Sequence, residues 1–119
     1  MCQVFLSADP QLYAHRARSL RLHGVVTSVR LENLFWHVLQ DIASRDGYTV
    51  PQLCTRLYDE LVAQRGAVDN FASFLRVCCT RYLALQLGGA IPQDRRIPLR
   101  SLPSEGTASA CATSALQRH

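Results

Sequence analysis

The sequence contains no lysine, so all 13 of its Lys and Arg residues are arginines. Two explanations stay open: a GC-rich genome, or a need for the side chain whose planar guanidinium matches phosphates and guanine edges. The formal net charge is +4, and the stretch from residue 10 to residue 31 holds four arginines and no acidic residue. This charge pattern fits a nucleic-acid partner without establishing one.

Long apolar runs are also missing. No stretch approaches the roughly 20 residues that cross a bilayer, so we predict neither a membrane span nor a membrane partner. The first ten residues, "MCQVFLSADP", lack the basic start and the apolar length of an export signal, and we therefore expect a cytoplasmic protein. Thiols are reduced in that compartment, so the five cysteines are expected to be mostly small core residues.

Spaced metal ligands and a catalytic constellation are absent too. Cys78 and Cys79 are adjacent, which does not match the spaced pairs of a zinc site, so no metal or cofactor is predicted. His37 and Asp41 stand four residues apart, but a solvated helix face explains them better than a general base. Cys54 has no discernible His or Asp partner. We predict that the protein is not an enzyme.

The features that are present predict one small domain with tails. Its 119 residues are 48% hydrophobic, which suits a folded core. We divide it into an N-terminal strand or hairpin extension (1–24), a core (25–87) and a tail rich in Gly, Pro, Ser and Ala that we predict to be disordered (88–119). The apolar stretch of residues 2–6 could be an edge strand. A chain this small is a reasonable candidate for dimerisation.

Residues 18–31, "RSLRLHGVVTSVRL", show two alternating runs around His23 and Gly24. This pattern predicts a β-hairpin, with an irregular connection as the alternative. The period then changes to that of a helix. Phe35, Val38, Leu39 and Ile42 predict a first helix over residues 32–45, which follows the strand directly.

Two further helices follow. The second is predicted to begin at Thr49 as N-cap, with Pro51 in the first turn, and to end near residues 64–67. The third begins at Asp69 or Asn70 and ends before the "GGAIP" of residues 88–92. Its apolar stripe is predicted to consist of Phe71, Phe74, Leu75, Cys78, Tyr82 and Leu85.

A strand that runs directly into a helix has two edges, and the backbone N–H and C=O groups of both edges need hydrogen-bond partners. The upstream run could pair with one edge, and we expect a second copy of the chain at the other. Alternation would then turn Val26, Ser28 and Arg30 outward and Thr27, Val29 and Leu31 toward the helices. The residues predicted to form the dimer interface are Thr27, Val29, Leu31, Phe35, Leu53 and Leu57.

The segments "RSLRLHGVVTSVRLENLFW" (18–36) and "NFASFLRV" (70–77) resemble the ribbon-helix-helix domains of the Arc and MetJ type. They are most similar to a bacterial subfamily with the pattern RS-x-R-L-x-G-x-x-TS-x-R-LE-x-x-FW. The resemblance implies a mainly α fold with a short β-ribbon in an intertwined homodimer. Here that fold would carry an extra N-terminal strand or hairpin and a third helix.

The same resemblance implies a transcriptional regulator that inserts its ribbon in the major groove of double-stranded DNA. Val26, Ser28 and Arg30 would then face the bases. The DNA backbone would be held by the start of the second helix and by two arginines of the upstream run, namely Arg18, Arg21, Thr49, Val50 and Gln52.

An upstream strand would widen such a ribbon. Two hairpins side by side make four strands at ~4.8 Å each, which approaches or exceeds a major groove ~12 Å wide. The alternative function is therefore a dimeric adaptor of the same fold that binds another protein and not DNA. In that case Trp36 and Tyr58 could be exposed anchors, although a core position suits each of them better.

Overall fold

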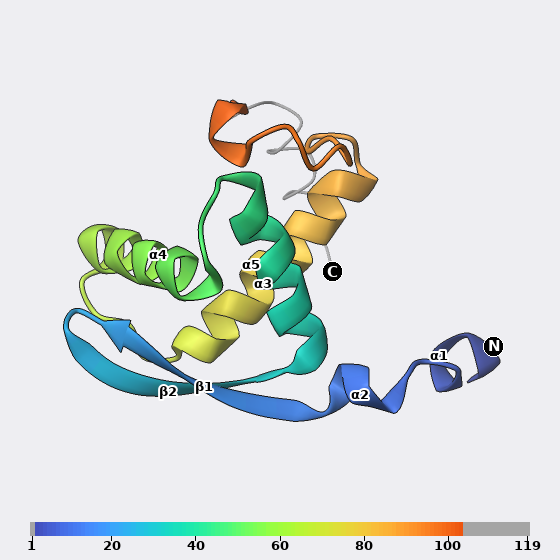
Figure 1. Ribbon diagram of the computed structural model, residues 1–119, viewed down its shortest axis with the longest axis horizontal. Coiled ribbons are helices and arrows are strands. Elements are labelled where there is room, and N and C mark those ends of the chain that lie inside the picture. Colours follow the sequence, from blue (N-terminus) through green and yellow to red (C-terminus); the bar gives the residue numbers. More distant parts are fainter. Residues whose placement is uncertain (1, 104–119) are drawn as a thin grey trace.

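The structure of the protein is a computed structural model in which residues 2–103 are described. Two strands form an antiparallel hairpin, the three long helices lie on one side of it, and the N-terminal residues extend beyond its open end (Figure 1). In chain order the elements are α1 Cys2–Leu6, α2 Pro10–Tyr13, β1 His15–Leu22, β2 Val25–Glu32, α3 Asn33–Arg45, α4 Val50–Arg65, α5 Phe71–Leu87 and the 3-10 turn η1 Leu99–Ser101. The fold is mainly helical with a short β-ribbon, as predicted.

The hairpin has a two-residue turn. His23 and Gly24 both have positive φ angles, 49° and 77°, as a type I′ turn requires. The turn sets Leu22 opposite Val25, and the pairing continues without a bulge to His15 opposite Glu32. The hairpin prediction is confirmed, and the irregular connection is excluded.

The three long helices begin and end close to where the sequence places them. Asn33 continues directly from β2, so the strand feeds α3 with no linker. The hydroxyl oxygen of Thr49 accepts a hydrogen bond from the amide of Gln52 at the start of α4. The side chain of Asn70 caps α5 in the same way, accepting from the amide of Ser73. These side chains satisfy amides that the helix itself leaves unpaired.

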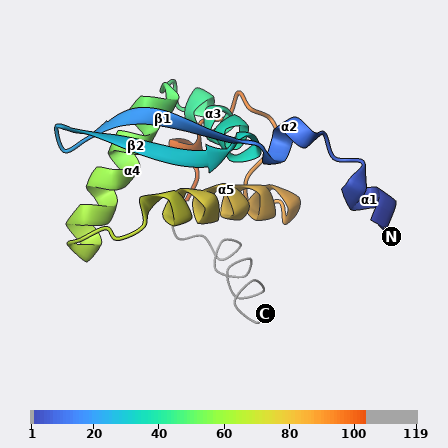
Figure 2. The same ribbon diagram turned by 90° about the horizontal axis from the view of Figure 1, so that it is seen from below.

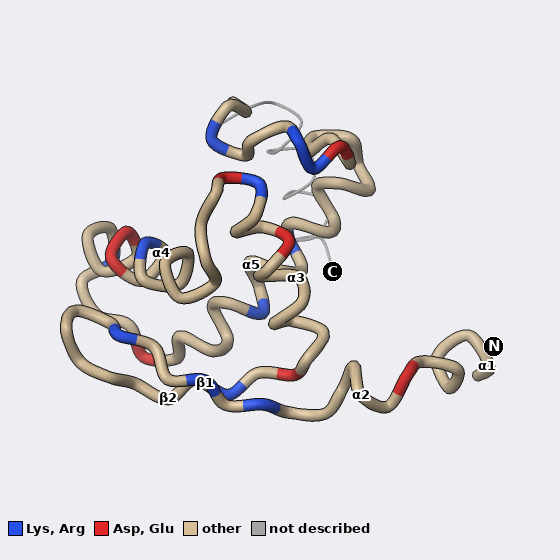
Figure 3. Tube along the Cα trace, in the orientation of Figure 1, with Lys and Arg blue, Asp and Glu red and all other residues tan. Residues whose placement is uncertain are grey.

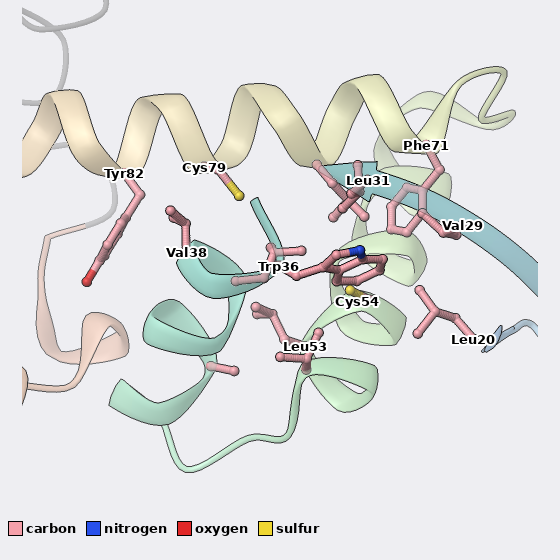
Figure 4. Packing of buried hydrophobic residues seen from close by; sticks show 14 of the residues in the cluster. Leu20, Val29, Leu31, Trp36, Val38, Leu53, Cys54, Phe71, Cys79 and Tyr82 are labelled. Atoms are coloured by element: carbon pink, nitrogen blue, oxygen red, sulfur yellow. The ribbon is translucent and has the colours of Figure 1, made fainter. Parts of the chain in front are cut away.

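The core lies between the hairpin and the helices. Trp36 is 1% exposed and lies near Leu31, Leu53 and Cys54 (Figure 4). Its indole N–H donates to the backbone carbonyl of Arg16 at 2.8 Å, which joins α3 to β1. The other core residues are Leu20, Leu22, Val29, Val38, Leu39, Ala43, Val50, Phe71, Leu75, Cys79 and Tyr82.

Two predictions at the ends of the chain were wrong. Residues 2–6 form the helix α1 and not an edge strand. Residues 88–103 are part of the fold, because Ile91 and Leu99 pack on the core and the buried Arg45 donates to the carbonyls of Asp94 and Ile97. The rest of the predicted disordered tail, residues 104–119, lies outside the described part of the chain. Within residues 2–103, no helix combines the length and apolarity needed to cross a membrane.

Candidate nucleic-acid interface

The hairpin has one face that no helix covers. Residues directly opposite each other in an antiparallel pair point to the same side. The register pairs Ala17 with Arg30, Ser19 with Ser28 and Arg21 with Val26, and all six side chains are exposed. We call these six residues the outward face. Since α3, α4 and α5 all lie on the other side of the hairpin, the outward face is open (Figure 1).

The outward face is basic. It carries two arginines and no acidic residue. Within residues 2–103, the guanidinium of Arg30 has neither an ion pair nor a hydrogen bond, and that of Arg21 makes only a long 3.5 Å contact with the carbonyl of Gly24. Figure 3 shows basic residues along the two strands. Both guanidinium groups are therefore available to a ligand.

Three of the six residues of the outward face were predicted from the sequence. Val26, Ser28 and Arg30 are exposed together, as predicted for the base-facing residues. Ala17 and Ser19 were missed, although a two-residue turn at His23 and Gly24 fixes the register and could have found them. Arg21, predicted as a contact to the DNA backbone, lies on the same face beside the turn.

Arg18 lies on the opposite face. Its Cα partner is the buried Val29, and its guanidinium carbon is 5.3 Å from the centroid of the Trp36 ring. Such an arrangement is a cation–π contact. The side chain is half-buried on the helix side of the hairpin, away from a duplex on the outward face, so its position does not favour the predicted phosphate contact. We therefore assign Arg18 a packing role.

The start of α4 has few free donors. Thr49 and Gln52 form a capping box in which the amide of Thr49 donates to the Gln52 side chain at 2.9 Å and the amide of Gln52 donates to the Thr49 hydroxyl at 3.2 Å. Pro51 has no N–H, and Val50 is 2% exposed. The amides that the sequence offered to a phosphate are thus largely occupied within the chain.

A hollow beside β1 offers donors instead. It measures about 400 Å³ and is lined by Arg21, Tyr48, Pro51, Gln52, Thr55 and Arg56. The guanidinium of Arg56 lies 5.3 Å from the Tyr48 ring centroid, and Thr55 donates to the carbonyl of Arg21 at 3.0 Å. We call it the flanking hollow. Arg56 was missed, although its i, i+4 spacing from Gln52 places both on one side of the helix.

The residues predicted to contact a second copy have different environments. Val29, Leu31 and Leu53 are buried within the single chain, Phe35 and Leu57 are half-buried, and Thr27 is exposed. One edge of β2 is paired with β1, and no strand of residues 2–103 pairs with its other edge. The dimer itself stays a prediction, because one chain is described.

The structure shows the environment of each residue that the sequence analysis considered for catalysis. Burial raises the pKa of the Cys54 thiol to about 12, so it is protonated near neutral pH. Asp41 accepts a hydrogen bond from Tyr82 at 2.6 Å and pairs with Arg95 at 2.7 Å, while His37 is exposed. In the described part of the chain, no three His, Cys, Asp or Glu side chains gather as a metal site would need.

Comparison with known proteins gives two findings. A family model described as "ribbon-helix-helix domain" matches residues 15–83, from the first residue of β1 into α5. The fold is also similar to the solved structure of an uncharacterized protein from Bordetella pertussis Tohama I, with 59% sequence identity and a TM-score of 0.87. That similarity covers 92% of this chain and 86% of the other. No curated protein matches the sequence.

Proposed function

We propose that the chain, which belongs to the ribbon-helix-helix family, binds double-stranded DNA through the outward face of its hairpin. This family has a non-enzymatic fold, and its members generally bind DNA as transcriptional regulators. The observation that carries the proposal is the open side of the hairpin, on which two arginines that make no ion pair within the described residues stand among four small side chains. Nothing on this side of the described chain has to move before a duplex can approach.

The width of the hairpin supports the same proposal. Two strands lie ~4.8 Å apart, so the hairpin of one chain fits a major groove ~12 Å wide with room for its side chains. A second copy paired at the free edge of β2 would double that width. The hairpin of a single chain is therefore narrow enough for the groove, and in the dimer expected from the sequence the upstream strands would have to splay away from it or contact the DNA backbone.

Each side chain of the outward face has a role that its chemistry allows. Arg30 can make a bidentate contact with guanine, and Ser19 and Ser28 can each make one short hydrogen bond to a base edge. Val26 and Ala17 suit a thymine methyl group. The flanking hollow, with Arg21 and Arg56 on its walls, suits a backbone phosphate next to the groove.

The experiment measures binding to duplexes selected from random or genomic fragments, at several salt concentrations. Replacing Arg30→Ala should cost about 1–3 kcal/mol and relax the preference for one base position. Replacing Arg21→Ala or Arg56→Ala should weaken binding to all sequences about equally and lower the salt dependence, because a phosphate contact is lost. Arg65→Ala, at the exposed C-terminal end of α4, is the matched control and should bind like the wild type.

Either of two results would contradict the proposal. If the selected duplexes bind with no dependence on salt, or if none of the three variants differs from Arg65→Ala, the hairpin does not read DNA. The adaptor function would then be favoured. Trp36 could not be its anchor, because it is 1% exposed.

A further inference from the structure

A polar hollow lies between α3 and the C-terminal half of α5. It measures about 480 Å³, a volume in the range of small-molecule sites. The segment that follows α5, coloured orange in Figures 1 and 2, folds back on the side of the molecule away from the hairpin and contributes Arg95 to the wall of the hollow. We call this hollow the polar cleft. Its polar lining includes His37, Gln40, Asp41, Tyr82, Gln86 and Arg95.

A hydrogen-bond network centred on Tyr82 connects the two walls of the polar cleft. The ring extends from α5 on the side of α3 (Figure 4), and the residue is 4% exposed. Its hydroxyl donates to the Asp41 carboxylate at 2.6 Å and accepts from the guanidinium of Arg45 and the side-chain amide of Gln86, each at 3.2 Å. Burial, followed by the hydrogen bond to Asp41, raises the pKa of Tyr82, so the hydroxyl keeps its proton at neutral pH. The walls are thus joined before any ligand arrives.

The charges around the polar cleft favour an anion over a cation. Asp41 is the one carboxylate that the described residues contribute to the lining, and both of its oxygens have partners: Oδ2 accepts from Tyr82, and Oδ1 lies 2.7 Å from Nε of Arg95. The Arg95 side chain, by contrast, is 72% exposed, and within residues 2–103 this ion pair is its one polar contact. The buried Arg45 adds a second positive charge next to Tyr82. An incoming anion therefore finds a guanidinium that Asp41 holds in position and that still has donors facing water.

The rest of the lining suits an organic ion better than an inorganic one. Val38 and Leu83 give the polar cleft an apolar part, and its volume is larger than a sulfate or phosphate ion needs. The side chains of His37 and Gln40 on α3 are exposed and make no hydrogen bond or ion pair within the described residues, so they can bind a further polar group. A guanidinium pairs with a carboxylate through two parallel hydrogen bonds. A small organic acid has both the carboxylate and the carbon skeleton that this lining accommodates.

We propose that the polar cleft binds a small organic carboxylate, whose carboxylate group is held by Arg95 and whose other polar groups meet His37 and Gln40. The bound acid contacts α3, α5 and the segment after α5 together. A ligand that binds only the folded chain stabilises it by mass action, so the acid should raise the melting temperature. The hairpin contributes no residue to this site, which therefore exists whether or not the outward face binds DNA.

The experiment measures binding to the full-length protein by isothermal titration calorimetry and thermal melts, without DNA. The probes are acetate, lactate, succinate and citrate at constant ionic strength, with succinamide as the uncharged match of succinate and sulfate as an inorganic anion. At least one of the acids should bind and raise the melting temperature, and succinamide should not bind. Sulfate should bind about tenfold more weakly than the best acid, because it leaves Val38 and Leu83 uncovered. If none of the acids binds, or if sulfate binds as tightly as the best of them, the proposal is overturned.

Three variants locate the site. Arg95→Ala should weaken binding of the best acid about tenfold or more, the size of a charge-assisted hydrogen bond. The matched control is Arg96→Ala, which removes a side chain that is 90% exposed, pairs with Asp94 and does not line the polar cleft, and it should bind like the wild type.

His37→Ala guards against an effect of Arg95→Ala that comes only from the lost ion pair with Asp41. It should weaken binding about threefold, the size of a neutral hydrogen bond. The melt without acid should not change, since the His37 side chain has no polar partner within the described residues. If Arg95→Ala and His37→Ala both bind the acid like Arg96→Ala, the acid binds elsewhere and the proposal is wrong. DNA binding is measured separately, with the arginine variants of the hairpin and α4, so either proposal can fail alone.

Discussion

At the scale of single residues, Trp36 links the two layers of the molecule. Its indole N–H donates to the carbonyl of Arg16, and its ring lies under the guanidinium of Arg18. Trp36→Phe keeps an aromatic ring but removes the buried N–H that donates to this carbonyl. We expect the free energy of unfolding to fall by about 1–3 kcal/mol, as measured by urea denaturation.

Tyr13→Phe is the control for Trp36→Phe, because it changes a polar group on an exposed aromatic side chain. It should leave the stability within about 0.5 kcal/mol of the wild type. If Trp36→Phe unfolds at the same urea concentration as Tyr13→Phe, the hydrogen bond to Arg16 does not stabilise the fold.

The positions of Trp36 and Arg18 depend on the same feature of the fold. The sequence favoured the core for Trp36, which its 1% exposure confirms, and the predicted contact of Arg18 with the DNA backbone stays a prediction. Both positions depend on how a helix approaches a strand, which periodicity along one segment does not encode. Cys78 was likewise predicted in the stripe of α5, whereas the fully buried residue is Cys79. Adjacent apolar residues leave the centre of a helical stripe ambiguous by one position.

At the scale of elements, the turn of the hairpin fixes which side chains face outward. Gly24 has a φ of +77°, and a Cβ added there would meet no atom within 4 Å. The cost of Gly24→Ala is therefore conformational. It should lower the free energy of unfolding by about 1–2 kcal/mol, because an L-residue is strained at this φ. Urea denaturation measures this change.

Gly88→Ala is the matched control for Gly24→Ala. Gly88 has a φ of −80°, and its added Cβ would meet only the carbonyl of Ala84 at an ordinary 3.5 Å. Alanine should be tolerated there or stabilise the chain slightly, since it restricts the unfolded state. Equal losses at the two positions would show that the turn conformation of Gly24 does not matter for stability.

The hairpin and the three long helices could be predicted because their signals are local. A change of period, the turn residues His23 and Gly24 and the caps Thr49 and Asn70 mark their limits. The errors concern segments whose structure is not determined locally. Residues 2–6 are too short for a period to distinguish a strand from a helix. Residues 88–103 look disordered by composition, yet Arg45, more than 40 positions earlier, holds them to the core.

At the scale of the whole molecule, the hairpin must be held in a fixed orientation on the helices if it is to enter a groove. Glu32, where β2 becomes α3, makes this connection. Its carboxylate accepts from the guanidinium of Arg76 on α5 at 2.9 Å and lies 3.7 Å from His15 at the start of β1. Three elements therefore meet at one side chain, which is a stronger constraint on the hairpin than the chain connection alone.

The contacts of Glu32 predict a specific dependence of stability on pH. The hydrogen bond from its own backbone amide, followed by that from Arg76, lowers the pKa of Glu32 below its usual value. A lowered pKa in the folded state means that the stabilisation is fully present above the unfolded pKa of about 4.3. It is lost as the pH falls through the lower, folded pKa. About a quarter of the side chain is exposed to solvent, so the contribution should stay below about 1 kcal/mol.

The measurement compares the free energy of unfolding of the wild type and Glu32→Gln between pH 7 and pH 3. The wild type should be more stable at pH 7, and the difference should disappear in the acidic range, because protonated Glu32 resembles glutamine. Glu60→Gln, an exposed carboxylate on α4, is the control and should show no such loss. If the two variants follow the same curve, the ion pair with Arg76 does not hold the hairpin to α5, and its orientation must come from the packing of Leu31 and Trp36 alone.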